Sequence, residues 1–408
     1  MLSRTFIQFS RRRAPPRGAV LFTTAAAAAT ALVAVSATAA TKSTASTAAA
    51  GPATSHKRKV SIHAVRGPRP TMEDRWFVSD DLKFFAVYDG HGGFRVAEQA
   101  QRLMYDEFMK QLEEKFEEQE QSSTVSASSS SQPESSDEPK ATSAEPHVMT
   151  PKEAKAAMER RYRFVEDPKH VSQALSRSFD MVSKRVLSST YLDLEGSTAV
   201  VVCVCEDNIV TANLGDSRAI LCRGSKAIPL TVDHKPDSAT EKKRIEDLGG
   251  RVRWHGYLGP DRLPVPGMGA YRINGNLAVS RALGDRLERP YVSSEPDIVV
   301  HPMNKNEDRF VVLASDGLWD VMTSQDVVDF VKQIMSMGTS ASASAASPPS
   351  ARSRMTAVVP SFLSSSSKTD VIRNEIDKRQ ENMAQFLVEE ALRRGSADNI
   401  TAIVVWLR

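Results

Sequence analysis

The chain has 408 residues, of which 41% are hydrophobic and 25% charged, enough for two average domains or one large domain with additions. Eleven of its 53 lysines and arginines lie in residues 1–72, which contain no acid, so residues 73–408 carry 42 basic against 50 acidic residues. An acidic remainder without a basic stripe argues against nucleic acid as a partner.

Residues 1–59 differ from the rest of the chain in composition. They are rich in arginine, then in alanine, threonine and serine, a composition typical of a mitochondrial transit peptide. The uncharged stretch 19–40 is long enough to span a bilayer, but alanine and threonine give it little affinity for lipid. We therefore expect mitochondrial import. A membrane anchor, a secretory signal and a plain disordered tail on a cytoplasmic protein remain alternatives.

The globular part is predicted to start at Val60. The apolar runs 60–65 and 84–88 read as strands, and the second run ends at Asp89-Gly90-His91-Gly92-Gly93. Glycines let such a turn bend sharply and let another group approach the backbone closely. An acid and a histidine held at a strand end are well placed for chemistry, although an ordinary β-turn with a polar tip has the same sequence.

Helical and disordered segments are expected on either side of the central region. Apolar residues recur at helical spacing over 96–116 and 171–182, and a further helix is predicted from Ser324 to Met335. Two serine-rich stretches, 118–150 and 338–368, lack periodicity and are predicted to be disordered insertions. The predicted organisation is therefore a leader, 1–59, and one domain, 60–408, that carries both insertions.

The middle of the chain has the pattern of strands, in short apolar runs at 197–205, 209–213, 218–222 and 227–230. The gaps between these runs are too short for the helix that joins parallel strands, so we predict an antiparallel meander. Residues 251–275 are rich in glycine and proline and are predicted to form a long irregular excursion, a candidate flap.

The chain has three cysteines, Cys203, Cys205 and Cys222, all inside apolar runs. An odd, clustered set forms no disulfide framework and has no zinc-ligand spacing. We expect buried structural thiols in a reducing compartment.

Acidic residues stand at turns beside several predicted strands. They are Asp89, Asp216, Asp316 and Asp398, with Glu73 and Asp74 beside a further strand and Asp320 one helical turn beyond Asp316. Each alone reads as an ordinary solvated acid. If they converge, they cannot all stay ionised unless cations neutralise them, because like charges raise one another's pKa. Oxygen ligands without cysteine or clustered histidine favour Mg²⁺ or Mn²⁺ over zinc.

These motifs, in this order, resemble the PP2C (PPM) family of metal-dependent serine/threonine phosphatases. The matching pieces lie at 69–74, 89–93, 196–199, 213–218, 233–236, 277–285, 314–320 and 395–401. Apart from the two insertions they cover roughly residues 60–408, and the ordered set is far more specific than any single motif. The resemblance implies an α+β fold, a four-layer α-β-β-α sandwich of two antiparallel sheets flanked by helices, with metals in a cleft at one end.

The resemblance also implies a ligand set for two metal ions. Asp89 would bridge both ions, and Gly90 would offer its backbone carbonyl. Glu73 would serve one ion, while Asp316 and Asp398 would serve the other. The expected cofactors are therefore two Mg²⁺ or Mn²⁺ ions.

Three further acids have implied roles around these ions. Asp74 would hold metal-bound water, and Asp216 and Asp320 would bind a weaker third ion together with Asp316. Asp216 could also simply shape its own turn, so its role stays open.

Two residues are candidates for direct contact with the substrate, one to bind its phosphate and one to donate a proton. Arg69 matches the family's phosphate-binding arginine, and a guanidinium can hold two phosphate oxygens at once. The alkoxide leaving group is poor, so a proton donor helps, and His91 is the only histidine in a metal-adjacent motif. The alternatives are a surface partner of Glu73 for Arg69 and a turn residue bonded to the backbone for His91.

The resemblance implies hydrolysis of phosphoserine and phosphothreonine in proteins by a metal-bridging hydroxide, in a monomer. One rival is an inactive, PP2C-like regulatory protein, but no metal carboxylate is missing. A cysteine-based phosphatase needs an arginine six residues after the cysteine, and a calcineurin-like enzyme needs an Asn-His-Glu signature; both are absent. A membrane-tethered scaffold, attached through 19–40, is the third rival.

Overall fold

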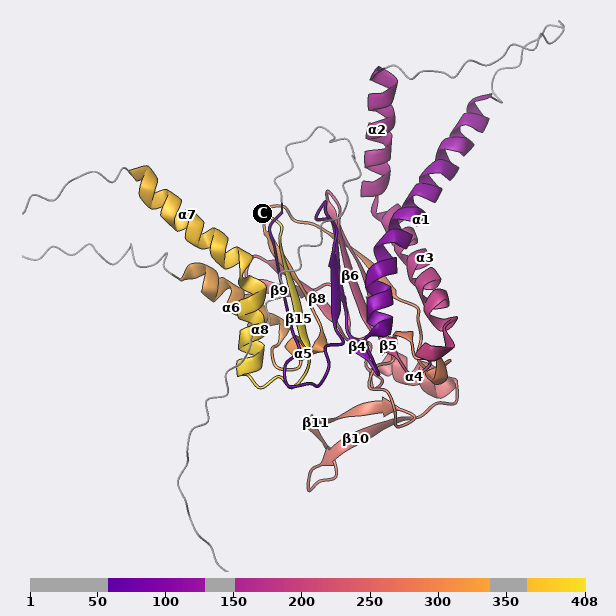
Figure 1. Cartoon of the computed structure of the whole chain (residues 1–408), viewed down its shortest axis with the longest axis vertical. Coiled ribbons are helices and arrows are strands. Elements are labelled where there is room, and N and C mark those ends of the chain that lie inside the picture. The colour runs from indigo at the N-terminus through magenta and orange to yellow at the C-terminus, as the bar shows by residue number, and fades with distance from the viewer. Residues whose placement is uncertain (1–57, 129–150, 338–364) are drawn as a thin grey trace, which may run out of the picture. The chain divides into compact units, whose positions relative to one another are not determined.

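The computed structural model describes residues 58–128, 151–337 and 365–408, all within one compact unit, Ala53–Arg408 (Figure 1). The predicted leader therefore lies outside the described residues except for its last two. Among the helices that are described, none is long and apolar enough to cross a membrane. The stretch 19–40 is not part of that search.

Two five-stranded antiparallel sheets form the centre of this unit. The first has the order β1-β15-β14-β8-β9 and the second β13-β7-β6-β3-β2. The strands of the first sheet are β1 (Val60–Val65), β8 (Arg218–Arg223), β9 (Lys226–Pro229), β14 (Asp308–Ala314) and β15 (Ile400–Trp406). Those of the second are β2 (Arg75–Val78), β3 (Phe84–Tyr88), β6 (Ala199–Val204), β7 (Asn208–Leu214) and β13 (Asp297–Pro302).

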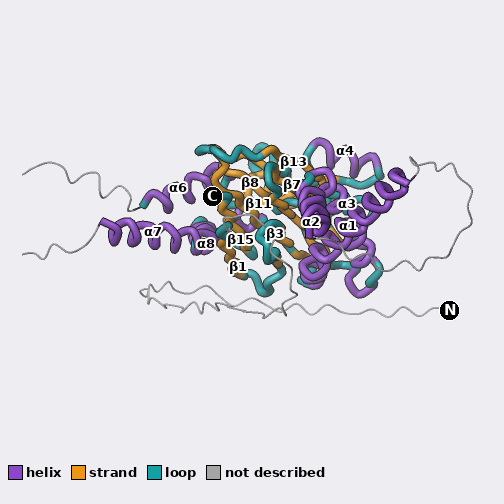
Figure 2. The backbone as a smooth tube through the Cα atoms, turned by 90° about the horizontal axis from the view of Figure 1, so that it is seen from above, coloured by secondary structure: helices purple, strands orange, loops and turns teal. Residues whose placement is uncertain are grey.

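The central strands are apolar on both faces because both faces are buried. On β3, Phe85 and Val87 point into the core between the sheets, while Phe84, Ala86 and Tyr88 point to the helices outside. Successive side chains of a strand alternate between faces, so one apolar run contributes side chains to two hydrophobic cores. The predicted α-β-β-α sandwich is confirmed, and Figure 2 shows helices on both sides of the strands.

Different helices cover the two outer faces. The second sheet packs on α1 (Arg95–Ser128) and α3 (Pro168–Leu187), and the first packs on α5 (Asp316–Trp319), α6 (Ser324–Ser336) and α8 (Met383–Arg393). The remaining helices are α2 (Pro151–Glu166), α4 (Ala239–Asp247) and α7 (Ser365–Glu381), with short 3₁₀ turns η1 (Thr190–Leu192) and η2 (Arg286–Glu288). A small sheet has the order β12-β5-β4, from β12 (Leu283–Gly284), β5 (Gly196–Ser197) and β4 (Gly90–His91).

The predicted four-strand meander is wrong in its connectivity. β6 and β7 pair in the second sheet, but the next strand, β8, lies in the first sheet and pairs with β9 and β14. The chain thus changes sheets at the turn 215–217. A three-residue gap is short enough for a hairpin and also for a step between two facing sheets, so its length could not distinguish them.

The predicted insertion at 118–150 is partly wrong. Helix α1 continues to Ser128, where the sequence predicted an end near Phe116, and helix α2, which was not predicted, lies beside it. The rings of Phe116 and Phe164 are 5.3 Å apart, and Arg160 Nε contacts Glu120 Oε1 at 3.1 Å. This packing stabilises a polar helix that periodicity alone could not reveal. Residues 129–150 lie outside the described residues.

The second insertion, 338–368, is described only from Ser365, where α7 begins. Its residues 338–364 lie outside the described part of the chain.

The candidate flap, predicted to be irregular, is mostly regular, with one shift of register between Gly256 and Leu258. It forms an antiparallel hairpin of β10 (Val252–Leu258) and β11 (Pro264–Ile273). Trp254 pairs with Tyr271, with ring centroids 5.3 Å apart, and such aromatic cross-strand pairs stabilise a two-stranded sheet.

Candidate metal centre

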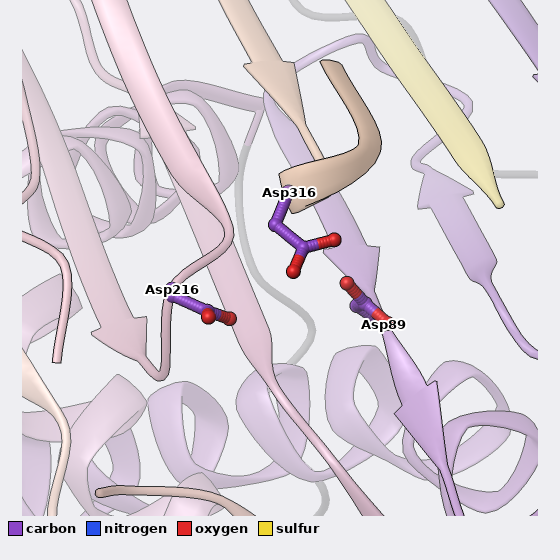
Figure 3. Close-up of side chains that lie close together, drawn as sticks. All are labelled: Asp89, Asp216 and Asp316. Carbon is purple, nitrogen blue, oxygen red and sulfur yellow. The ribbon is translucent and has the colours of Figure 1, made fainter. Parts of the chain in front are cut away.

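The ends of strands from both sheets bring three carboxylates together. Asp89 follows β3, Asp216 lies in the turn between β7 and β8, and Asp316 begins α5, two residues after the end of β14. One oxygen from each lies within 4.8 Å of the others (Figure 3). In that view the Asp316 carboxylate points toward Asp89, and Asp216 reaches in from the neighbouring turn. Residues 227 positions apart in the chain thus share one site.

A glycine lets Asp398 join this group. A Cβ on Gly317 would lie 2.0 Å from the backbone oxygen of Asn399, so only glycine allows α5 to pack against the start of β15. As a result Asp316 and Asp398 lie close enough for the charge of Asp398 to raise the pKa of Asp316.

Asn399 fixes the loop that carries Glu73. Its Nδ2 donates to the backbone oxygens of Arg66 and Thr71 at 2.8 and 2.9 Å, and its Oδ1 accepts from Glu73 N at 2.7 Å. The amide of one buried side chain therefore holds residues 66–73 beside the strand end that follows Asp398.

The carboxylates of the site carry like charges close together and are largely shielded from water, and both effects raise their pKa values. Loss of hydration, then the charges of Asp74, Asp316, Asp216 and Asp398, raise the pKa of Asp89 well above its usual range. Loss of hydration, followed by the charges of Asp216 and Asp320, also raises the pKa of Asp316 well above its usual range. A group of carboxylates in this condition is stabilised by any cation that neutralises it.

Asp74 is buried, with 3% of its surface exposed, the same fraction as Asp216. Its side chain accepts a hydrogen bond from Ser315 Oγ at 2.7 Å, and burial raises its pKa to about 6. Its other oxygen, Oδ1, is buried and has no hydrogen-bond partner in the described structure. A buried acceptor of this kind calls for a donor or a cation.

Asp216 and Asp320 lie near one lysine. Lys235 Nζ forms an ion pair with Asp216, and its charge also acts on Asp316 and Asp320. Burial raises the pKa of Asp320, and Lys235 opposes that shift. The Asp216 carboxylate therefore lies both in the cluster and against the ammonium of Lys235, whose side chain is 39% exposed.

Arg69 lies at the rim of the cluster and contacts Asp398, not Glu73. Its side chain is 54% exposed, and it forms an ion pair with Asp398. The alternative reading, a surface partner of Glu73, is therefore not what the structure shows. Glu73 instead accepts a hydrogen bond from Thr71 Oγ1 at 2.7 Å.

His91 pairs with a second acid, Asp285. His91 Nε2 and Asp285 Oδ2 are 2.8 Å apart. Burial lowers the pKa of His91, but the charge and hydrogen bond of Asp285 outweigh burial, so the pKa is raised overall. A Cβ on Gly196 would lie 2.1 Å from Asp285 Oδ2 and 2.3 Å from His91 Nε2, so this glycine makes room for the pair.

All ten predicted site residues thus belong to one end of the sandwich, and the structure adds partners that the sequence did not reveal. Asp285 and Lys235 lie in motifs that were recognised, but neither was given a role. Their partners lie 194 and 19 positions away, so only the folded chain shows the pairs. In the first pair, His91 lies in β4 of the small sheet, and in the second, Asp216 lies in the turn after β7.

The donor atoms fit Mg²⁺ or Mn²⁺. They are carboxylate oxygens, with one buried oxygen of Asp74 unpartnered, and the neighbouring His91 is engaged with Asp285. The three cysteines are buried and free, and burial raises the pKa of Cys205 to about 12, so thiolate ligands and thiolate nucleophiles are both disfavoured.

The raised pKa of Asp74 predicts that the stability of protein stripped of metal by EDTA depends on pH. Its pKa is about 6 when folded and 3.8 as a free side chain, so the folded state binds more protons between these values. Stability should therefore fall as pH rises from about 4 to about 6, by about 3 kcal/mol. The measurement is the difference in free energy of unfolding between Asp74→Asn and wild type, which should grow over this range and then level off. A matched surface variant, Asp180→Asn, should show no such trend, and a flat difference for Asp74→Asn would contradict the burial argument.

Comparisons with known proteins show which family this sequence and fold resemble. Residues 142–352 match the family model described as protein phosphatase 2C. The chain is 31% identical over 374 residues to protein phosphatase 2C 53 of Oryza sativa, covering 85% of this chain and 70% of that protein. It is 34% identical over 356 residues to protein phosphatase 2C 16 of Arabidopsis thaliana, covering 86% of this chain and 58% of that protein. The fold is similar to the crystal structure of a serine-threonine phosphatase 2C from Toxoplasma gondii, with a TM-score of 0.52 and 23% identity, covering 86% and 95% of the two chains.

Proposed function

The chain belongs to the protein phosphatase 2C family of serine/threonine phosphatases, and we propose that it hydrolyses phosphoserine and phosphothreonine in proteins with Mg²⁺ or Mn²⁺ as cofactor. The observation that carries this proposal is the group of Asp89, Asp216 and Asp316, whose oxygens lie within 4.8 Å of one another. Such a group is costly without cations and well suited to them.

The carboxylates would hold two cations. Asp89 comes from the second sheet and Asp316 and Asp398 from the first, and, together with burial, the charges of both raise the pKa of Asp89, which suits the bridging role that the family resemblance implies for Asp89. Glu73 and the carbonyl of Gly90 would complete the set, with Asp216 and Asp320 available for a weaker third ion. When bound, the ions would neutralise these acids, activate a water for attack and stabilise charge on the phosphoryl oxygens.

Arg69 would bind the phosphate. Its side chain is 54% exposed, and its only ion-pair partner among the described residues is Asp398 at the edge of the cluster. A guanidinium in this place can turn to a phosphate dianion once cations neutralise Asp398.

His91 would donate a proton to the leaving seryl or threonyl oxygen. Asp285 accepts from one ring nitrogen at 2.8 Å, which fixes the ring and favours the protonated form. The second nitrogen is then left as the proton donor toward the substrate.

The inactive alternative is not favoured, because every acid that the family resemblance assigns to the metals is present and near the others. The direct test is phosphate release by the full chain from a phosphothreonine peptide in Mn²⁺. We expect turnover on that peptide. Binding of the peptide without phosphate release would favour the inactive, regulatory alternative instead.

The other parts of the proposal concern partners and location. We propose that phosphoproteins are the substrates and that the chain acts as a monomer. We also propose that residues 1–59 direct it to mitochondria, which imaging of a fluorescent protein fused to these residues tests. Fluorescence of that fusion at a membrane outside mitochondria or in the cytoplasm would contradict mitochondrial targeting and favour a membrane anchor or a cytoplasmic protein instead.

A further inference from the structure

The hairpin of β10 and β11 carries positive charge on an otherwise acidic domain. Residues 251–275 contain four arginines and one acid, whereas residues 73–408 as a whole carry more acids than bases. The one acid, Asp261, accepts a hydrogen bond from Leu263 N at 3.0 Å and lies in the turn of the hairpin. The strands themselves therefore have basic side chains with no acid among them.

Two of these arginines lie directly opposite each other. Arg253 of β10 pairs with Arg272 of β11 in the antiparallel register. Like charges at directly opposite positions destabilise a strand pair. In the described structure neither arginine has an ion-pair partner, and Arg272 donates only to the backbone oxygen of Asn276. The pair thus has uncompensated charge that an anion would neutralise.

The arginines occupy one face of the hairpin because the other face is used for packing. Val252 and Ile273 belong to a small apolar cluster with Ile245 of α4. Trp254 and Tyr271 continue that face. Side chains alternate along a strand, so the arginines one position away point to the opposite face.

The segment that follows the hairpin is hydrogen-bonded beside a residue that contacts the metal centre. Ser280, seven residues after Ile273, donates from its backbone and from its hydroxyl to the oxygen of His234 at 3.1 and 2.9 Å. The next residue, Lys235, forms the ion pair with Asp216. Figure 1 and Figure 2 show the hairpin at the end of the sandwich where α5 begins, not along its side.

We propose that the face formed by Arg253 and Arg272 binds carboxylate side chains of the substrate near its phosphorylated residue. The inference rests on the proposed function and adds a substrate class, phosphoproteins with acidic residues close to the phosphoserine or phosphothreonine. An extended peptide advances roughly 3.3 Å per residue, so a seven-residue strand such as β10 matches several flanking residues. A carboxylate matches the planar guanidinium in a bidentate contact.

The test compares two phosphothreonine peptides that differ only in glutamate or glutamine at the flanking positions. For the wild-type full chain we expect kcat/KM to be about tenfold higher for the glutamate peptide, mainly through KM, as two partly exposed charge contacts allow. Arg253→Gln/Arg272→Gln should reduce this ratio to about twofold or less and leave kcat/KM for the glutamine peptide and for p-nitrophenyl phosphate unchanged. Higher ionic strength should reduce the wild-type ratio, because salt screens exposed charges.

A matched control removes two arginines from helices that cover the second sheet. Arg102 of α1 and Arg177 of α3 are exposed, so Arg102→Gln/Arg177→Gln makes the same change in net charge and should keep the preference for glutamate. Equal hydrolysis of both peptides by wild type would overturn this inference and leave the proposed function standing. Binding of phosphatidylserine vesicles through Arg253 and Arg272 without a peptide preference would assign the face to a membrane instead. Failure to hydrolyse any peptide or p-nitrophenyl phosphate would count against the proposed function itself.

Discussion

Replacing Asp316 with asparagine is expected to lower kcat/KM on a phosphothreonine peptide by about a thousandfold. One carboxylate oxygen of Asp316 lies within 4.8 Å of oxygens of Asp89 and Asp216, so its charge belongs directly to the group that would hold the cations. An amide has no negative charge, so affinity for the cations and the stabilisation of charge at phosphorus would both fall. The measurement is the initial rate at saturating Mn²⁺ and across a Mn²⁺ titration.

The same variant should be more stable than wild type when metal is removed. The pKa of Asp316 is raised by lost hydration and by Asp216 and Asp320, so the ionised carboxylate costs stability in the folded state. In EDTA, Asp316→Asn should therefore melt at a higher temperature than wild type, while the surface variant Asp180→Asn should not. Loss of activity together with loss of stability would point to misfolding and would contradict the assigned role.

Replacing His91 with glutamine is expected to lower kcat on the phosphothreonine peptide by about a thousandfold, within the range of general acid catalysis. Glutamine can keep a hydrogen bond to Asp285 but cannot donate a proton to the leaving oxygen. On p-nitrophenyl phosphate, whose leaving group needs no proton, the loss should be about tenfold or less. The ratio of the two losses is the informative quantity.

A matched histidine elsewhere gives the control. His63 lies on β1 in the first sheet, and His63→Gln should leave both substrates unaffected. Equal losses on both substrates for His91→Gln would show that His91 positions the site without donating the proton.

Much of the candidate site could be predicted because its acids follow strands. Asp89 comes directly after β3 and Asp316 two residues after the end of β14, and both apolar runs are plain in the sequence, so side chains at the ends of these buried strands have a fixed place. The two sheets between helices were implied by the family resemblance, whereas the spacing of the apolar runs alone predicted a single meander. The roles assigned to these residues stay predictions until they are tested.

Other features depend on contacts that only the fold creates. Asp285 has a left-handed backbone, with φ of 48°, and reaches His91 across the small sheet of β4, β5 and β12, which are two-residue strands too short to recognise from periodicity. The turn at 215–217 joins β7 of one sheet to β8 of the facing sheet, and Gly215, with φ of 108°, packs against Thr198 where a Cβ would not fit. The hairpin at 252–273 contains the glycines and prolines typical of a loop, yet its strands pair in antiparallel register and place Trp254 against Tyr271.

The most direct test of the metal centre is the binding of Mn²⁺ to full-length protein that has first been stripped with EDTA. Calorimetry or electron paramagnetic resonance should show two bound Mn²⁺ per chain, with phosphatase activity absent before the titration and rising as the sites fill. Asp316→Asn should bind fewer ions or bind them more weakly. Full turnover of the phosphothreonine peptide in EDTA, with no Mn²⁺ bound, would contradict a site built on Asp89, Asp316 and Asp398.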